Sequence, residues 1–461
     1  MKDILGYLKS HEQEFMSELF DYLRIPSISA TDANKSDINK AAVFTEKLLK
    51  KAGLKNVRQY KTKGNPLVYG EWLGAKGKPT VLIYGHYDVQ PPDPLDLWKT
   101  APFEPTIRNG KLFARGAADD KGQVFLHFKA IEAWLKTRKE LPLNVKVIVE
   151  GEEEIGSPSL GAFIRQQKKL LKCDAILISD TNMEGTNIPS ICYSLRGLTY
   201  LEMKVTSTKG DLHSGMFGGA VANPIQVLSE ILVACKDPKT GKVKIPGFYK
   251  DVLPLTKRER ANLARVPHDE KKFLRDIGAR KAFGEKGYTT LERIGARPTF
   301  EVNGIWGGFT GEGVKTVLPA HASAKVSMRL VANQDPNKIA RLFMNYVKKI
   351  APDTVKLEVK MYENNGDPAL TPLDFPGMKA AANAIRKTFG KDPVFTREGG
   401  SIPIVADFQK HLKAYSVLMG FGLPDDNLHA PNEKMNISQI KKGMATIAYF
   451  LDDYAQMSAS G

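Results

Sequence analysis

Four short, mainly apolar runs stand out along the chain, and a polar residue or glycine directly follows each of them. They are rich in valine and isoleucine and too short for helices, which is typical of strands buried on both faces of a sheet. The runs are residues 81–85 before His86, 145–149 before Glu150, 175–179 before Asp180 and 415–419 before Gly420.

Helical periodicity occupies stretches between these predicted strands. Apolar residues recur at helical spacing over residues 37–52, up to Gly53, and again over residues 121–135. Alternating strands and helices predict an α/β fold, in which helices cover both faces of a central, mostly parallel sheet.

A different pattern begins near Gly197. Apolar and polar side chains alternate over residues 199–205, 322–331 and 355–361, and helical patterns occupy residues 223–234 and 336–350. Alternation with period two is typical of strands with one exposed face. This part of the chain is therefore predicted to be an inserted α+β domain with an open antiparallel sheet.

The length and composition fit this organisation. A chain of 461 residues suits two or three domains, and 42% apolar with 26% charged residues is ordinary for a globular protein. We predict a discontinuous α/β domain of residues 1–196 and 369–461, and an inserted domain of residues 197–368. With three cysteines, no apolar leader and no run of ~20 apolar residues, a cytoplasmic protein without a membrane segment is expected.

The net charge of +16 raises the question of a nucleic-acid partner. A basic surface binds phosphates by releasing their counterions. Here, however, the lysine pairs are scattered along the chain, without interleaved aromatic residues or a recognisable nucleic-acid-binding motif. A solvated basic surface is the better explanation, and no nucleic-acid partner is expected. The basic stretch 236–297 suggests no function by itself.

Candidate chemistry gathers where the predicted strands end. His86 ends one strand, and Asp88, two residues on, points the same way on an extended chain. Asp119 precedes a predicted helix, a position where a single aspartate is often only a cap. The acidic run 150–154 is ordinarily a solvated turn, but at the carboxyl end of a strand a bound cation would offset the repulsion among its carboxylates.

Taken together, these side chains indicate a metal site. The candidates are His86, Asp119, Glu153 or Glu154, Asp180 and His429. Two histidines with several carboxylates suit Zn²⁺ or Mn²⁺ better than Ca²⁺. Five ligands exceed what one tetrahedral zinc with an open position needs, whereas two metals sharing a carboxylate would use them all.

Two other motifs are misleading. Residues 308–316 resemble a phosphate-binding loop, but Val314 separates the glycine from the lysine. Residues 399–403 resemble the nucleophile elbow of a serine hydrolase, but Pro403 replaces its last glycine.

Seven segments, in order along nearly the whole chain, resemble a known family. They are residues 85–91, 115–122, 150–157, 179–180, 210–215, 397–403 and the loop around His429. The sequence is similar to the two-metal metallopeptidases, in the branch of carnosinase and the cytosolic non-specific dipeptidase.

The resemblance implies a role for each matching residue. Asp119 would bridge the two metals, and its peptide bond to Asp120 is typically cis in the family. His86 and Asp180 would complete one metal site, and Glu154 and His429 the other.

The resemblance also implies the groups that act on the substrate. Glu153 would be the general base, and Asp88 the residue that positions it. His213, on an inserted lid and dimerisation domain, would reach the partner's active site in a homodimer. Arg329 and Ser401 would hold the substrate's carboxylate.

The expected function is hydrolysis of dipeptides or short peptides with a free C-terminal carboxylate. Two divalent metal ions per subunit, zinc or manganese, would activate a bridging water, and Glu153 would take its proton and pass it to the leaving amine. One alternative is a related amidohydrolase acting on N-acyl amino acids, of the deacylase, desuccinylase or carboxypeptidase type. A more remote one is a non-enzymatic basic binding protein on a hydrolase scaffold.

Overall fold

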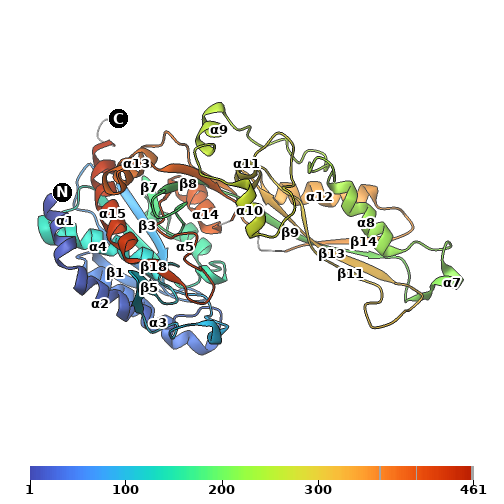
Figure 1. The fold of residues 1–461 in the computed structure, drawn as a ribbon, viewed down its shortest axis with the longest axis horizontal. Helices are drawn as coiled ribbons and strands as arrows, with labels where there is room; N and C mark the ends of the chain where they lie inside the picture. The colour runs from blue at the N-terminus through green and yellow to red at the C-terminus, as the bar shows by residue number, and fades with distance from the viewer. Residues whose placement is uncertain (363–364, 401, 458–461) are drawn as a thin grey trace. The chain divides into compact units, whose positions relative to one another are not determined.

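The computed structural model describes residues 1–362, 365–400 and 402–457. The chain forms two compact units (Figure 1). The first comprises Met1–Tyr193, Thr371–Thr396 and the chain from Asp407 onwards, and the second comprises Ser194–Leu370 and Arg397–Ala406. The assignment of a catalytic domain and a lid or dimerisation domain stays a prediction.

A mixed sheet forms the centre of the first unit. Its order is β1-β2-β6-β3-β7-β17-β8-β15, and β16 also pairs with β8. The strands are β1 (Lys55–Tyr60), β2 (Leu67–Trp72), β3 (Thr80–His86), β6 (Asn144–Glu150), β7 (Ala175–Ile178), β8 (Ser190–Leu195), β15 (Ala369–Leu370), β16 (Val394–Glu398) and β17 (Tyr415–Leu418). By the boundaries above, β15 and the last two residues of β8 and of β16 are counted with the second unit.

The four strands expected from the apolar runs are the parallel centre of this sheet. β6, β3, β7 and β17 are neighbours and run parallel, whereas β1, β2 and β8 pair in antiparallel fashion on either side. The predicted α/β class is therefore confirmed, with antiparallel strands added at the edges.

Helices cover both faces of this sheet. Neighbouring residues of β3 point to opposite faces: Tyr84 packs its ring on Phe408 of α14, while Gly85 lies against Val124 of α4. The helices of the first unit are α1 (Lys2–Ser10), α2 (Glu12–Leu23), α3 (Lys35–Lys51), α4 (Lys121–Arg138), α5 (Leu160–Gln166), α6 (Lys168–Leu171), α13 (Pro376–Phe389), α14 (Pro403–Leu412) and α15 (Ile437–Met457).

A small three-stranded sheet also belongs to the first unit. Its order is β18-β5-β4, with β4 (Thr106–Arg108) and β5 (Lys111–Phe113) forming a hairpin and β18 (Lys434–Asn436) leading into α15. Through β18 it is joined to the loop that carries His429.

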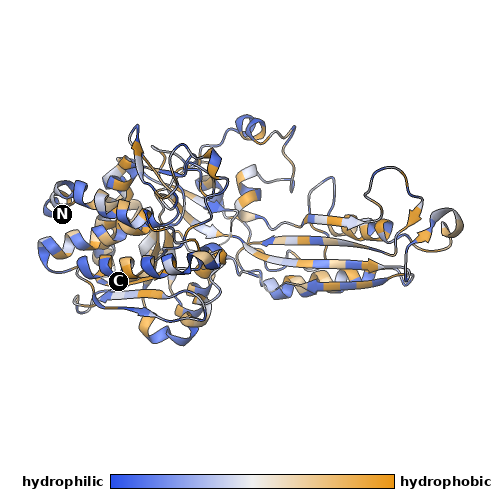
Figure 2. Ribbon diagram, turned by 90° about the horizontal axis from the view of Figure 1, so that it is seen from below, coloured by the Kyte–Doolittle hydropathy of each residue, from blue (hydrophilic) through white to orange (hydrophobic). Residues whose placement is uncertain are grey.

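The second unit is built on an antiparallel sheet of order β11-β13-β9-β14. Its strands are β11 (Glu301–Gly307), β13 (His321–Leu330), β9 (Gly197–Thr206) and β14 (Lys356–Met361). Along β9, buried side chains alternate with side chains that are mostly half-buried, and Figure 2 shows the same alternation in hydropathy along the strands of this sheet. The predicted open sheet is therefore present.

Two helices pack on the buried face of this second sheet. They are α8 (Pro224–Cys235) and α12 (Pro336–Ile350), and each begins with a proline preceded by a capping side chain, Asn223 or Asp335. Leu228 and Phe343 belong to the core beneath them.

The shorter elements of the second unit lie outside this core. They are β10 (Leu212–His213), α7 (Ser214–Phe217), α9 (Lys257–Leu263), α10 (Glu270–Asp276), α11 (Thr290–Ala296) and β12 (Val317–Leu318). Within the described ranges, no helix is long and apolar enough to cross a membrane.

Candidate metal centre

The candidate ligands meet at the carboxyl ends of the parallel strands. His86 is the last residue of β3, Asp180 lies just beyond β7, and Glu154 lies in the turn after β6. Asp119 comes just before α4, and His429 belongs to the loop between β17 and β18. Side chains at this edge converge because the parallel strands all end there, which is where ligands bind in open α/β sheets.

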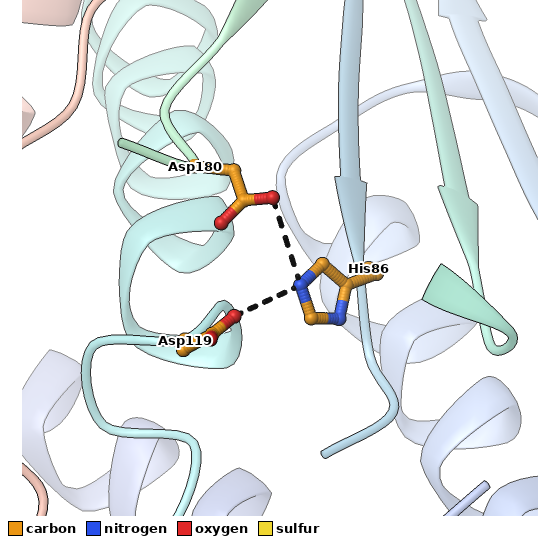
Figure 3. A group of neighbouring side chains, drawn as sticks. All are labelled: His86, Asp119 and Asp180. Carbon is orange, nitrogen blue, oxygen red and sulfur yellow. Dashed lines mark hydrogen bonds and ion pairs between the residues drawn. The ribbon is translucent and has the colours of Figure 1, made fainter. Parts of the chain in front are cut away.

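One group of three side chains forms around His86 (Figure 3). The Nε2 atom of His86 lies 3.1 Å from Oδ1 of Asp119 and 3.9 Å from Oδ2 of Asp180. Its other ring nitrogen, Nδ1, lies 3.0 Å from the backbone oxygen of Asp88. This contact orients the ring, so that Nε2 faces the two carboxylates in the way that metal-binding histidines are held.

A second group forms around His429. Its Nε2 atom lies 2.9 Å from Oδ2 of Asp119 and 3.3 Å from Oε2 of Glu154. In each group, one ligand atom from every residue lies within 4.8 Å of the others. Asp119 belongs to both groups and offers a different oxygen to each.

The electrostatics of the cluster suit cations. Burial raises the pKa of Asp180 to about 7, with the Asp119 carboxylate adding to the shift. Hydrogen bonds with Asp119 and Glu154 raise the pKa of His429 to about 10. Without a cation, His429 would therefore be protonated and Asp180 partly protonated at neutral pH, and bound divalent ions would displace these protons.

Glu154 directly tests whether these residues suit a bound cation. Its Oε1 atom is buried and has no hydrogen-bond partner among the described residues, although Gln90 donates to its Oε2 at 2.9 Å. An unpartnered buried carboxylate oxygen is costly, and a cation would satisfy it. The residues present therefore fit a metal centre.

The turn that carries Glu153 and Glu154 is held by Asp88. The backbone N–H groups of Glu153 and Glu154 donate to the two carboxylate oxygens of Asp88, at 3.2 and 3.1 Å. Burial raises the pKa of Glu153 to about 9, and the carboxylates of Asp180 and Glu154 act in the same direction. Asp88 is thus linked to the backbone of both acids.

The Asp119 loop is held by a residue that sequence reasoning missed. Glu433 is fully buried and accepts hydrogen bonds from Arg115 Nη1 at 2.7 Å and from the backbone N–H groups of Gly116, Ala118 and Asp119 at 3.0, 2.9 and 3.1 Å. The one available signal was an acidic residue four positions after His429.

Asp120, the next residue, contacts the end of strand β3. The peptide bond between Asp119 and Asp120 is cis, as the family resemblance implies. The Oδ2 atom of Asp120 accepts a hydrogen bond from the backbone N–H of His86 at 3.1 Å. The two aspartates thus face different partners.

Two further expected residues, His213 and Arg329, are not among the side chains of this cluster. His213, in β10, accepts a hydrogen bond from the backbone N–H of Gly215 at 3.1 Å. Arg329 lies in β13, where its backbone oxygen accepts from Thr299 at 2.9 Å. Both belong to the second unit, and Ser401 lies outside the described residues. Their roles stay predictions.

Comparison with known proteins identifies the family. The model of peptidase family M20/M25/M40 matches residues 82–453, and the chain belongs to this family. It is 33% identical to the Cys-Gly metallodipeptidase of Schizosaccharomyces pombe, over 97% of each chain. It is 30% identical to the human Beta-Ala-His dipeptidase, over 99% of this chain and 93% of that protein.

A solved structure shows the same fold. The metallo-carboxypeptidase Sso-CP2 of Sulfolobus solfataricus, of the M20 family, is 34% identical, with a TM-score of 0.82 over 96% of this chain and 99% of the other. The chain is therefore a peptidase of this family, as the sequence motifs predict.

Proposed function

We infer that this peptidase hydrolyses the peptide bond of dipeptides and other short peptides with a free C-terminal carboxylate, using two divalent cations. The observation that carries the proposal is the Asp119 carboxylate, whose two oxygens face two different imidazoles at 3.1 and 2.9 Å. The dipeptidase activities in the names of the yeast and human relatives support dipeptides as substrates.

Five side chains would hold the cations. His86 and Asp180 would bind one ion, Glu154 and His429 the other, and Asp119 both. The cations would polarise the scissile carbonyl and make the attacking water more acidic. Zn²⁺ and Mn²⁺ both suit this set of two imidazoles and three carboxylates.

Glu153 would move the proton. A carboxylate within reach of the attacking water can accept its proton and donate it to the leaving amine. Its backbone N–H is held by Asp88, which would keep the side chain in position during both transfers. Glu154, held in the same way, would bind metal instead.

The second unit would supply the groups that select the substrate. Arg329 offers a planar fork suited to a free carboxylate, and Ser401 would assist it. His213 would stabilise the oxyanion, from the partner subunit of a homodimer. A cytoplasmic location is in keeping with the three buried cysteines, which form no disulfide in the described part of the chain.

A substrate panel tests the proposed specificity. Metal-stripped protein is reconstituted separately with Zn²⁺, Mn²⁺ and Co²⁺ and assayed with Cys-Gly, β-Ala-His and an N-acetylated dipeptide. Free dipeptides are expected to be cleaved faster than the acetylated one. The opposite order would favour a carboxypeptidase or N-acyl amidohydrolase, an alternative supported by the similarity to the Sulfolobus carboxypeptidase.

A further inference from the structure

A basic hollow lies in the first unit, on the loop that carries His429. Its volume is about 470 Å³. The hollow is lined by Lys99, Arg108, Asn109, Lys111, Phe113, Asn427 and Asn432. None of these residues belongs to the proposed metal centre.

Two of the cations face each other on the β4–β5 hairpin. Arg108 and Lys111 are direct cross-strand partners, on either side of the tight turn formed by Asn109 and Gly110, both with positive φ. Like charges placed opposite each other destabilise a hairpin. A local arrangement that breaks such a rule is expected where a ligand compensates for it.

The charges in the hollow are only partly balanced. Lys111 Nζ lies 3.9 Å from the carboxylate of Asp425, which lies closer, at 3.1 Å, to Lys434. Arg108 donates to the hydroxyl of Thr100 at 3.1 Å and stacks on Phe113. Across the described ranges, neither Lys99 nor Arg108 forms an ion pair with a carboxylate.

Two asparagines that also line the hollow supply neutral polar groups. Asn432 accepts a hydrogen bond from the backbone N–H of Lys99 at 2.9 Å and donates to the backbone oxygen of Leu97 at 2.8 Å. Asn427, in turn, donates to the backbone oxygen of Asn432 at 3.4 Å. The two asparagines lie two residues before and three residues after His429.

We propose that this hollow binds a small phosphate-type oxyanion, held by Arg108, Lys111 and Lys99. Three cations from two segments, with amide groups beside them, match the charge and hydrogen-bonding needs of a multivalent oxyanion. Since Asn427 and Asn432 flank His429, the anion also contacts the loop that carries a proposed metal ligand. Inorganic phosphate and a phosphomonoester share this chemistry.

Calorimetric titration of the metal-loaded full chain with inorganic phosphate, and separately with glycerol phosphate, tests the proposal. We expect saturable binding of at least one of them, and the tighter binder identifies the source of the phosphate group. Arg108→Gln and Lys111→Gln should each weaken binding about tenfold or more, because each removes a charge-assisted contact. Lys99→Gln, at an exposed position, gives a third variant with little risk to folding.

A double variant in the second unit serves as a control for net charge. Lys348→Gln with Lys349→Gln removes two exposed positive charges from α12 and should leave phosphate binding unchanged. Hydrogen exchange should show phosphate-dependent protection of residues 106–113 and 425–433, lost in Arg108→Gln. Absence of saturable binding, or binding and protection that all three single variants leave unchanged, would overturn the proposal.

Discussion

Glu153 and Glu154 are neighbours in sequence but have different surroundings. Both backbone N–H groups donate to Asp88, so one carboxylate holds the turn that carries both side chains. Glu154 directs a carboxylate oxygen towards His429, at 3.3 Å. The proposed roles, a proton carrier and a metal ligand, follow from this difference.

Replacing each glutamate separately should separate these roles. Glu153→Gln is expected to keep both cations and lose about 10²- to 10⁴-fold in kcat, since it removes the proton acceptor without removing a ligand. Glu154→Gln is expected to lose a cation. Metal content and steady-state rates measure the two effects, and near-normal turnover by Glu153→Gln would exclude its role as the base.

Glu433 shows how a residue outside the proposed ligand set can shape it. One buried carboxylate accepts four hydrogen bonds from the loop that ends in Asp119. Glu433→Gln should therefore weaken cation binding as well as stability, because an amide cannot replace a charged acceptor of four donors. Titration of the stripped variant with Zn²⁺ gives the affinity.

A buried glutamate in the second unit provides the control for Glu433. Glu292 pairs with Arg260 and closes the capping box of α11. Glu292→Gln should lower stability while leaving Zn²⁺ affinity unchanged. If Glu433→Gln binds Zn²⁺ as the wild type does, its carboxylate does not position the Asp119 loop.

Much of the candidate site could be predicted from sequence at the residue scale. His86 and Asp180 each follow an apolar run that predicts a buried strand. Parallel strands end at the same edge of a sheet, so the two side chains are expected to lie close together. The contact between Glu433 and the Asp119 loop could not be predicted, because it joins residues more than 300 positions apart and three of its four hydrogen bonds come from backbone N–H groups. Every residue type except proline carries a backbone N–H group, so the sequence does not mark which of these groups will bind a carboxylate.

At the scale of elements, the site depends on how closely α4 approaches β3. A Cβ atom added at Gly85 would lie 2.5 Å from Val124 and 2.6 Å from the carboxylate of Asp120. Only glycine therefore allows the start of α4, and with it Asp119, to lie beside His86.

Gly85→Ala is expected to destabilise the fold by about 1–3 kcal/mol, through overpacking of a well-filled contact. Gly6→Ala is the matched control, since a Cβ there meets nothing within 4 Å and lies in helix α1. The control should be neutral or slightly stabilising. Thermal unfolding compares the two, and equal melting temperatures would contradict the close approach.

The buried His127 of α4 predicts a pH dependence of stability. Burial lowers its pKa to about 3, and its Nε2 lies 2.9 Å from the hydroxyl of Ser179. The folded state therefore binds fewer protons than the unfolded state below the ordinary histidine pKa of about 6.5. Its contribution to stability is present above that pH and is lost as the pH falls.

His127→Gln should remove this contribution to the pH dependence. Between pH 7.5 and 5, the unfolding free energy of the variant should fall by about 2 kcal/mol less than that of the wild type. Urea unfolding at each pH measures the difference, with the exposed His321→Gln as control. Parallel curves for His127→Gln and wild type would contradict the expectation.

Some strands can be predicted from the sequence pattern more readily than others. The four parallel inner strands are fully or almost fully buried, so mainly apolar runs predict them. β1 and β11 contain no fully buried residue and lack a clear apolar pattern. They form because neighbouring strands offer backbone partners, which local sequence does not record.

At the scale of the whole molecule, more than half of the net positive charge lies in residues 236–297. Several of these charges are paired locally, as Arg260 is with Glu292 and Arg297 with Glu285. Capping boxes begin α9 and α11 in the same stretch. Ion pairs and helix caps therefore contribute to the order of this stretch.

The most direct test of the account is the number of cations that the active protein holds. Metal analysis of the reconstituted, extensively dialysed chain should find two divalent ions per chain, and their removal should abolish dipeptide hydrolysis until they are restored. Full activity with one ion or none would contradict the shared role of Asp119.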